Sequence, residues 1–192
     1  MSSSRNTFIR SLHDLGGAAW FGGSLMGVVA LNGAAGDISD PTQRARIAAN
    51  GWARWSPAVV VAIAAHLVGG AGLSLVHHDR IRDQSGVGAN TLAKTTLTAA
   101  ALATTAYSGV LGAKVAKDGD AHTESSTKPS EHTPPDVAKA QQQLRVLQWA
   151  TPVLTGALVV LGALHGEQQR PAERLRGLGK KATQRTSDLL DS

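Results

Sequence analysis

The sequence contains no cysteine, and it has only two phenylalanines and one tyrosine among its 192 residues. The lack of cysteine excludes disulfide frameworks, thiolate metal sites and cysteine nucleophiles. Because aromatic side chains normally supply much of a soluble core, their scarcity indicates that other residues organise the apolar part of this chain. Glycine, alanine, leucine and valine fill that role, and they gather in blocks. The mean hydropathy of −0.08 therefore averages very apolar blocks with very polar connections.

The apolar blocks predict four transmembrane helices. They lie at about residues 12–31, 57–76, 91–113 and 146–165. A helix of about 20 residues rises roughly 30 Å, which matches the hydrocarbon layer of a bilayer. The blocks lack the broad polar face of a soluble amphipathic helix, and Lys94 is the only full charge inside them beyond the mouth of the first block. We therefore expect an all-α fold, a four-transmembrane-helix bundle over residues 1–168.

Two alternatives to this interpretation are a soluble four-helix bundle and a cleaved first block. Arg5 and Arg10 precede the first block, as basic residues precede a secretory signal. Its apolar stretch is longer than a signal core, however, and three further blocks follow it. We therefore expect the first block to remain in the protein as a membrane span.

The connection before the second block has an amphipathic pattern of its own. Residues 43–55 combine three arginines with Trp52 and Trp55. We expect a short interfacial helix with its indoles at headgroup depth. Ser56 and Pro57 then resemble the N-cap and the first residue of the second span.

The connection between the third and fourth blocks differs in kind. Residues 114–136 are rich in serine, threonine, proline and charge, which predicts a mobile outer loop. Asp136 can cap a helix that begins at Val137. Residues 137–149 then form a polar extension of the fourth helix, outside the membrane.

Lysines and arginines beside the spans favour a chain with both its N-terminus and its C-terminus in the cytoplasm. The strongest element of this bias is the basic cytoplasmic tail, residues 169–192, which we expect to bind anionic inner-leaflet lipid at about 1 kcal/mol per basic residue. Its basic residues are Arg170, Arg174, Arg176, Lys180, Lys181 and Arg185. Lipid binding accounts for the net charge of +5, and no nucleic-acid-binding motif is present.

Small residues recur every four positions in three of the blocks. The series are Ala19, Gly23 and Gly27; Ala58, Ala62, His66, Gly70 and Ser74; and Thr96, Ala100, Thr104, Ser108 and Gly112. A spacing of four places each series along one helix face. Such faces hold membrane helices together, because lipid provides no hydrophobic drive between them. The same faces would serve a homo-oligomer or a larger membrane complex equally well.

A short pattern, H-x-[LV]-G-G-A, occurs at residues 13–18 and again at residues 66–71. Either chance in a sequence rich in glycine and alanine or an internal duplication would explain it. In both places a glycine pair follows the histidine within one helical turn. Another group could therefore approach each imidazole closely.

Histidines near the expected inner membrane surface are the candidate ligands for heme b or a metal ion. They are His13, His77, His78 and His165. Asp14, Asp79 and Glu167 are placed to orient their imidazoles. An interfacial polar role is the simpler alternative for these four histidines.

His66 is expected in the middle of a span, where polar groups usually face the bundle interior. We expect it either to hydrogen-bond a threonine of the third helix or Gln148, or to line a proton or substrate path. It lies about ten residues, roughly 15 Å, from the inner end of its helix, whereas His13 lies within a turn or two of that surface. The two are therefore expected to be a poor pair for one heme.

Polar side chains elsewhere predict no ordered site. The outer loop contains Asp118, Asp120, His122, Glu124, Glu131 and His132. Their spacing matches no metal-binding pattern, so we expect a solvated acidic loop. Neither Tyr107 nor Lys94 has a convincing partner. No G-x-S-x-G, H-E-x-x-H or P-loop pattern occurs, and no nucleophile and base can be argued together.

The first helix resembles that of several membrane families. His13 followed by Trp20, Gly22 and Gly23 is similar to the "H…W-x-G-G" helix of copper resistance D-type proteins and of membrane-embedded heme-binding proteins. That resemblance implies that His13 is a metal or heme ligand, although Asp14 and the lack of a methionine or cysteine cluster depart from a copper pattern. The whole-chain layout, with "GWARWSP", "AYSGVLG" and "ALHGEQQRP", resembles an actinobacterial four-helix integral membrane family with no assigned activity.

The functional expectation is a non-enzymatic integral membrane protein, an accessory or scaffold component of a membrane assembly. One alternative is a heme- or metal-binding redox or transport protein that uses the boundary histidines. Another is a small transporter with His66 in a polar path.

Overall fold

A computed structural model describes residues 7–76 and 85–190, with side chains described over residues 7–75 and 90–164. The chain divides into two compact units, Met1–Leu158 and Val159–Ser192. The first unit contains all the helix packing considered below. The second is the C-terminal part of the last helix.

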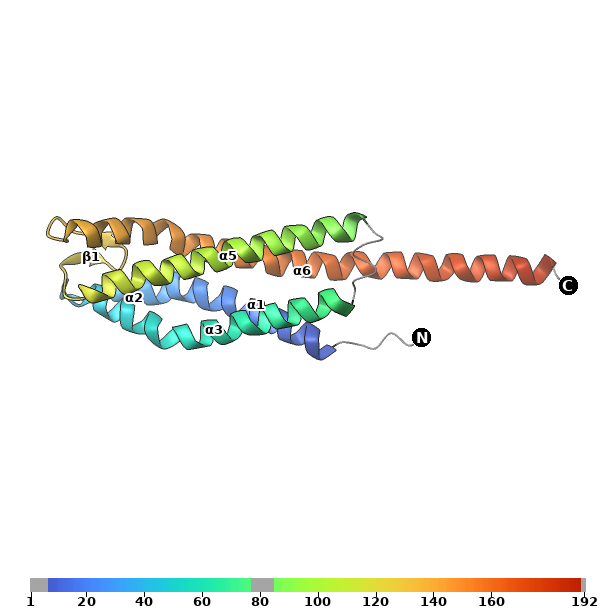
Figure 1. Ribbon diagram of the computed structural model, residues 1–192, viewed down its shortest axis with the longest axis horizontal. Helices are drawn as coiled ribbons and strands as arrows, with labels where there is room; N and C mark the ends of the chain where they lie inside the picture. The colour runs from blue at the N-terminus through green and yellow to red at the C-terminus, as the bar shows by residue number, and fades with distance from the viewer. Residues whose placement is uncertain (1–6, 77–84, 191–192) are drawn as a thin grey trace. The chain divides into compact units, whose positions relative to one another are not determined.

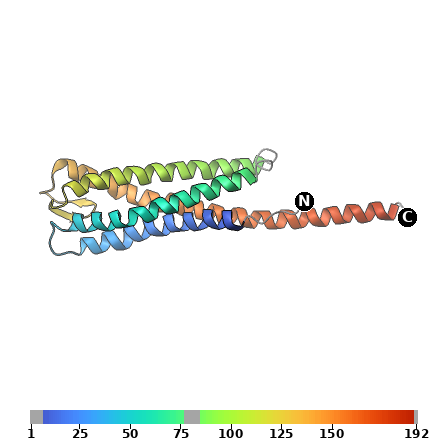
Figure 2. The same ribbon diagram turned by 60° about the horizontal axis from the view of Figure 1, so that its bottom comes forward.

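The described chain is almost entirely helical (Figure 1). Its elements are α1 (Thr7–Met26), the π-helix η1 (Gly27–Leu31), α2 (Asn32–Gly36), α3 (Arg44–Val76), α5 (Ser85–Lys117), strands β1 (Thr123–Ser125) and β2 (Lys128–Pro129), and α6 (Pro135–Leu190). Figure 2 shows that α1, α3, α5 and the first part of α6 run along a common direction in the first unit. The all-α prediction is confirmed, apart from the small antiparallel β1–β2 sheet.

Three helical stretches are long and apolar enough to cross a membrane, namely Thr7–Gly36, Arg44–Leu75 and Pro135–Leu164. They correspond to the first, second and fourth predicted spans. The described part of α5 is not among them, because serines, threonines and Lys94 dilute its apolar residues. A fourth span over residues 91–113 stays a prediction.

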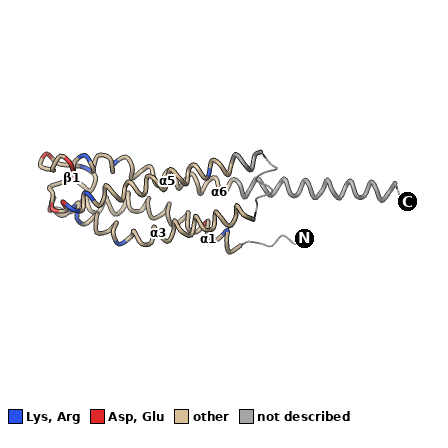
Figure 3. The backbone as a smooth tube through the Cα atoms, in the orientation of Figure 1, with Lys and Arg blue, Asp and Glu red and all other residues tan. Residues whose placement is uncertain are grey.

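Apolar side chains lie on the outside of the bundle. On α3, Val60 is 65% exposed and Val61 is 68% exposed, and Val153 of α6 is 66% exposed. Charged residues of the described part of the chain gather mainly at the end that carries β1, with few along the helices (Figure 3). Exposed apolar faces of this extent mark contact with lipid or with another protein.

The closest helix pairing joins α1 to α3, and glycines make it possible. A Cβ on Gly16 would lie 2.5 Å from the carbonyl oxygen of Ala62 and 2.5 Å from the backbone nitrogen of His66. A Cβ on Gly69 would lie 2.5 Å from the backbone nitrogen of His13. Only glycine therefore permits these two backbones to touch.

The same interface corrects the predicted small-residue faces. Gly23, Gly27 and Ala62 of the predicted faces are buried, but Ala19, Ala58 and Ser74 are exposed. Gly16 and Gly69, which the predicted faces omit, are buried at the contact. The buried positions of α1 follow a mixed spacing of three and four residues, as Gly16, Trp20 and Gly23 do. A strict spacing of four drifts away from that line.

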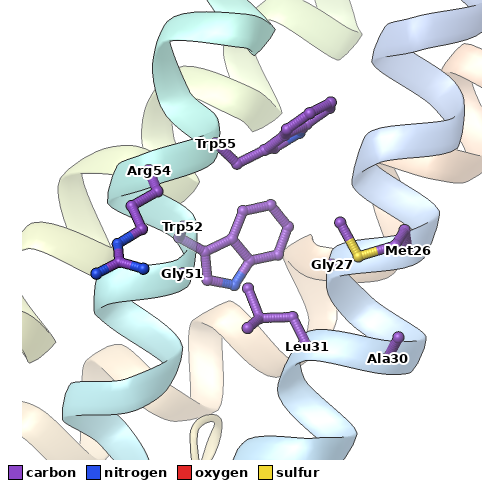
Figure 4. Close-up of a pocket in the computed structure, with 8 residues that line it drawn as sticks. All are labelled: Met26, Gly27, Ala30, Leu31, Gly51, Trp52, Arg54 and Trp55. Atoms are coloured by element: carbon purple, nitrogen blue, oxygen red, sulfur yellow. The ribbon is translucent and has the colours of Figure 1, made fainter.

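The short interfacial helix predicted over residues 43–55 is not confirmed as a separate element, because α3 is continuous from Arg44 to Val76 with Pro57 inside it. Ser56 is not an N-cap; its hydroxyl donates to the carbonyl oxygen of Trp52, one turn earlier, at 2.9 Å. Proline within a helix costs a backbone hydrogen bond. Packing offsets this cost, since the indoles of Trp52 and Trp55 lie against Gly27 and Gly23 of the first helical run (Figure 4).

The segment 114–136, predicted as a mobile loop, contains hydrogen-bonded structure. Gln141 of α6, fully buried, donates from its amide to the carbonyl oxygens of Ser125 at 3.1 Å and Ser126 at 3.2 Å. Arg44 donates to the carbonyl oxygen of Glu124 at 3.0 Å. Residues distant in sequence thus order a segment whose own composition favours a loop.

The polar extension of the fourth helix is confirmed as helix, because α6 begins at Pro135 and continues through residues 137–149. It begins two residues earlier than predicted. Asp136 lies in the first turn and pairs with Lys114 of α5 at 3.4 Å. Val137 and Ala140 pack against Leu111 of α5 in a small apolar core at this end of the bundle.

The turn before α3 depends on Asp40, and this generates a prediction about pH. Hydrogen bonds from the side chains of Thr42 and then Gln43, and from the Thr42 amide, lower the pKa of Asp40 from 3.8 to about 2. A lowered folded-state pKa gives stability that is fully present above pH 3.8 and is lost as the pH falls through about 2. We expect Asp40→Ala to melt below the parent at pH 6, and this difference to vanish near pH 2.

Melting temperatures followed by circular dichroism in one detergent would measure this difference. Asp37→Ala is the matched control, because the Asp37 carboxylate accepts no hydrogen bond within the part of the chain that the structure describes. A deficit in Asp40→Ala that stays constant from pH 6 to pH 2 would contradict the proposed role of the carboxylate.

Candidate functional site

A pair of histidines occupies the crossing of α1 and α3. The Nδ1 atom of His13 lies 2.8 Å from the carbonyl oxygen of His66, and the Nδ1 atom of His66 lies 3.1 Å from the carbonyl oxygen of His13. A carbonyl oxygen only accepts, so each Nδ1 carries the proton and donates it. Each histidine thus binds the backbone of the other.

The two imidazoles also stack on each other. Their centroids are 4.0 Å apart and their planes differ by 20°. A Cβ on Gly17 would lie 3.0 Å from His66 Nδ1, and a Cβ on Gly70 would lie 3.2 Å from His13 Nδ1. The glycine that follows each histidine by four positions therefore makes room for the ring of the other.

These contacts explain the repeated H-x-[LV]-G-G-A pattern. Residues 13–17 of α1 and residues 66–70 of α3 make equivalent contacts with the opposite helix. In each segment the histidine donates to a carbonyl oxygen of the other helix, the first glycine contacts the backbone of that helix, and the second glycine lies beside its histidine ring. The two copies face each other across an approximate two-fold axis. The pattern is thus the sequence signature of a symmetric helix contact, whether or not it arose by duplication.

Trp20 fixes one side of the pair. Its indole is 1% exposed, lies 6.2 Å from the His66 ring in an edge-on arrangement, and donates to the hydroxyl of Thr105 on α5 at 3.2 Å. Together with Ala62 and Ala101 it forms the apolar core at this level. The site therefore joins three helices.

Charged side chains stand near the pair on two helices. The fields of Asp14 on α1 and Lys94 on α5 both reach His66, and Arg10 lies close enough to Lys94 to influence it. His66 itself is 5% exposed. Because each imidazole binds the backbone of the other helix, the pair can clamp α1 to α3.

The geometry limits what metal chemistry the pair can perform. Axial ligands of one iron point their nitrogens at it from opposite faces, about 2 Å away on each side. Stacked rings 4.0 Å apart leave no space between them for an iron. His13 and His66 are therefore not a bis-histidine heme site in this arrangement. Among the described residues no group of three or more metal-ligating side chains occurs.

The expectation that His13 and His66 lie at different depths is wrong. It assumed a first helix starting near residue 12, whereas α1 begins at Thr7. His13 thus lies in the second turn of α1, and Ile9 lies beside Gly72 of α3. With this register the two histidines meet.

The expected partners of His66 were also wrong. Gln148 accepts instead from the amide of Asn32 at 2.7 Å, and Asn32 accepts from the Trp52 indole at 3.0 Å. Thr105 binds Trp20 rather than His66. Tyr107, for which the sequence suggested no partner, donates to Gln143 of α6 at 3.1 Å.

Several other predicted site residues cannot be placed, because the structure does not describe their side chains. His77 and His78 lie outside the described residues, as do the side chains of His165 and of the basic residues of the tail, although the tail helix itself extends to Leu190. In the segment 114–136, His122 and His132 lie with their rings 6.0 Å apart. The structure therefore brings together one candidate, His13, with His66.

Sequence reasoning missed Thr105, Gly16 and Gly69 as parts of the site, and assigned Trp20 a role only through resemblance. The repeated pattern did contain Gly16 and Gly69, so its glycines were the available signal. Nothing in the sequence around Thr105 distinguishes it from the neighbouring Thr104.

The close approach at Gly16 generates a second prediction. Gly16→Ala should destabilise the protein by about 1–3 kcal/mol, because its Cβ collides with backbone atoms that cannot rotate away. Gly22→Ala on the same helix is the control, since its Cβ would meet nothing within 4 Å. Alanine there should be neutral or stabilising by up to ~1 kcal/mol. Unfolding of both variants in one detergent measures the difference, and equal stability would refute the backbone contact.

The comparisons with known proteins supply no role for this site. Comparison of the chain with protein-family models, with curated proteins and with solved structures finds no match. The resemblance of the first helix to metal- and heme-binding families, and that of the whole chain to an actinobacterial family, therefore stay predictions. The contacts within the chain are the basis for its proposed function.

Proposed function

We propose that this chain is a non-enzymatic integral membrane protein, an accessory or scaffold component of a membrane assembly, which crosses the bilayer four times. The observation that carries the proposal is the distribution of polarity. Large apolar side chains lie outside, while Ser24, His66, Thr151 and Thr155 are buried between helices. Apolar side chains on the outside are favourable when lipid, rather than water, surrounds the protein.

Buried polar groups support the proposal, because they are paired mainly with the bundle itself. Thr155 donates to the carbonyl oxygen of Thr151 at 2.7 Å, and the Thr151 hydroxyl lies 3.3 Å from that of Thr104 on α5. The imidazoles of His13 and His66 bind backbone carbonyls. In hydrocarbon an unpaired polar group costs several kcal/mol, so such pairing is what a span requires.

In this proposal α5 is the remaining span. Its exposed surface includes Leu92 and Val110, and its threonines return hydrogen bonds to their own helix, as Thr95 does to Thr91 at 2.9 Å. Such bonds reduce the cost of hydroxyl groups in lipid. Lys94, one charge near the start of the predicted span 91–113, can extend its side chain toward the headgroups.

The two ends of the chain would then lie on the cytoplasmic side. Four crossings return the chain to the side where it began, and the basic helix 169–190 would lie near anionic inner-leaflet lipid. The β1–β2 end would face the outside. A scaffold of this form offers other membrane proteins its exposed apolar faces, including a second copy of itself.

The proposal predicts membrane extraction and topology. We expect the protein to leave membranes only with detergent, and not with carbonate or high salt, because its exposed faces are apolar. Reporter tags at the two ends should both be cytoplasmic, while a tag inserted after Asp120 should be external. Recovery of the chain in the soluble fraction, or end tags on opposite sides, would refute the four-span proposal.

A second candidate, heme or metal binding through boundary histidines, has one supporting observation. A ligating histidine usually donates its other ring nitrogen to a carbonyl or carboxylate, and His13 does this at Nδ1, leaving Nε2 as the ligand atom. Since His66 stacks on His13, His66 would not supply the second ligand in this candidate.

A visible absorption spectrum and metal analysis of the purified protein discriminate the two candidates. For a scaffold we expect no Soret band and no stoichiometric metal, in the parent and in His13→Ala alike. A Soret band in the parent that disappears in His13→Ala, while the band of a Gly33→Ala control persists, would favour the heme candidate and overturn the scaffold proposal.

A further inference from the structure

Two histidines meet at the β1 end of the bundle, where their spacing in the sequence indicated no ordered site. His122 directly precedes β1, and His132 precedes α6, which begins at Pro135. The centroids of their rings are 6.0 Å apart, with an angle of 69° between the ring planes. Both residues are exposed. The fold therefore brings together two accessible imidazoles that are separate in the sequence.

The backbone of residues 130–133 maintains this proximity. The Ser130 hydroxyl donates to the carbonyl oxygen of His122 at 2.8 Å, and the Thr133 hydroxyl donates to the same oxygen. The amide of His132 donates in turn to the Ser130 hydroxyl at 3.3 Å. Thr133 is buried, so the turn is anchored in the protein. The backbone of His132 thus stays close to that of His122, whichever rotamers the two exposed rings adopt.

The separation of the rings suits two ligands of one metal ion. Zinc binds an imidazole nitrogen at about 2.0–2.1 Å, which places the ring centroids of two such ligands about 5–6 Å apart. The observed separation of 6.0 Å lies at the upper end of this range. Because both side chains are exposed, each can rotate to turn one nitrogen toward a shared ion. The stacked rings of His13 and His66, at 4.0 Å, leave no such space.

The donor atoms indicate the class of ion. Neutral imidazole is a ligand for zinc, copper and nickel, whereas calcium and magnesium prefer oxygen ligands. The carboxylate of Asp40 lies close enough to His122 for their charges to interact, and its negative charge favours a cation there. In the described parts of the chain no third metal-ligating side chain groups with the two histidines, so water would complete the coordination.

We propose that His122 and His132 together bind one divalent transition-metal ion of the zinc class. The site uses neither His13 nor His66. The bound ion joins the residue before β1 to the turn before α6, two segments that otherwise depend on the hydroxyls of Ser130 and Thr133. An ion that binds only the folded chain raises its stability. Binding therefore stabilises the β1 end of the protein.

Isothermal titration calorimetry with zinc chloride, on the full chain purified in detergent without a polyhistidine tag, tests this site. We expect the parent to bind zinc with micromolar affinity, and calcium chloride to give no binding. His122→Ala and His132→Ala should each weaken zinc binding at least ~tenfold. The double variant should bind zinc no more weakly than either single variant, because removing one of two ligands already opens the site.

Glu131→Gln is the matched control, since it changes an exposed neighbour of His132 and leaves both imidazoles in place. It should bind zinc as the parent does. With EDTA present, all of these variants should melt with the parent, because the substituted side chains are exposed. Added zinc should raise the melting temperature of the parent and of Glu131→Gln only.

Zinc affinity that is unchanged in either single histidine variant would overturn the inference. So would losses in the single variants that add up in the double variant, as two independent surface imidazoles would give. A loss in Glu131→Gln as large as that in His132→Ala would assign the ion to carboxylates instead, and calcium binding equal to zinc binding would do the same.

Discussion

The backbone contact between α1 and α3 is the constraint on which the rest of this fold depends. Gly16 and Gly69 allow the two helices to approach until each histidine reaches the carbonyl of the other helix. That approach brings Trp20 against Ala62 and within reach of Thr105, and farther along it seats the indoles on the first helical run. The remaining helices pack onto this pair through larger side chains, so its register decides where they lie.

Polar groups in this bundle mainly fix geometry. Without a hydrophobic drive between helices in lipid, hydrogen bonds and close packing must specify the arrangement. Asn32 illustrates this, since its amide accepts from Trp52 and donates to Gln148 and so links three helical elements. At the β1 end the helices are held together instead by an apolar core that includes Leu111 and Val137.

Much of the fold followed from the sequence, because uncharged stretches of helical length have one favourable environment. The start of α3 did not follow from the sequence. Pro57 suggested that a helix begins there, but packing against the first helical run keeps the helix continuous through it. The β1–β2 hairpin depends on Arg44 and Gln141, which are distant in the chain. The histidine pair was missed because the depth of His13 depends on where α1 begins. The first turn of α1 contains Arg10, so the apolar pattern of the sequence did not indicate that the helix begins at Thr7. The repeated glycines were visible, but their partners were not.

The symmetry of the histidine contact gives it a built-in redundancy. Each Nδ1 donates to a main-chain oxygen, and no side-chain replacement removes that oxygen. Losing either imidazole therefore breaks only one of the two bonds, and the other survives. A substitution of one histidine therefore leaves the hydrogen bond of the other histidine in place, whereas a displacement of the helix axes breaks both hydrogen bonds at once. Natural variation should consequently be tolerated more readily at the rings than at the glycines between them.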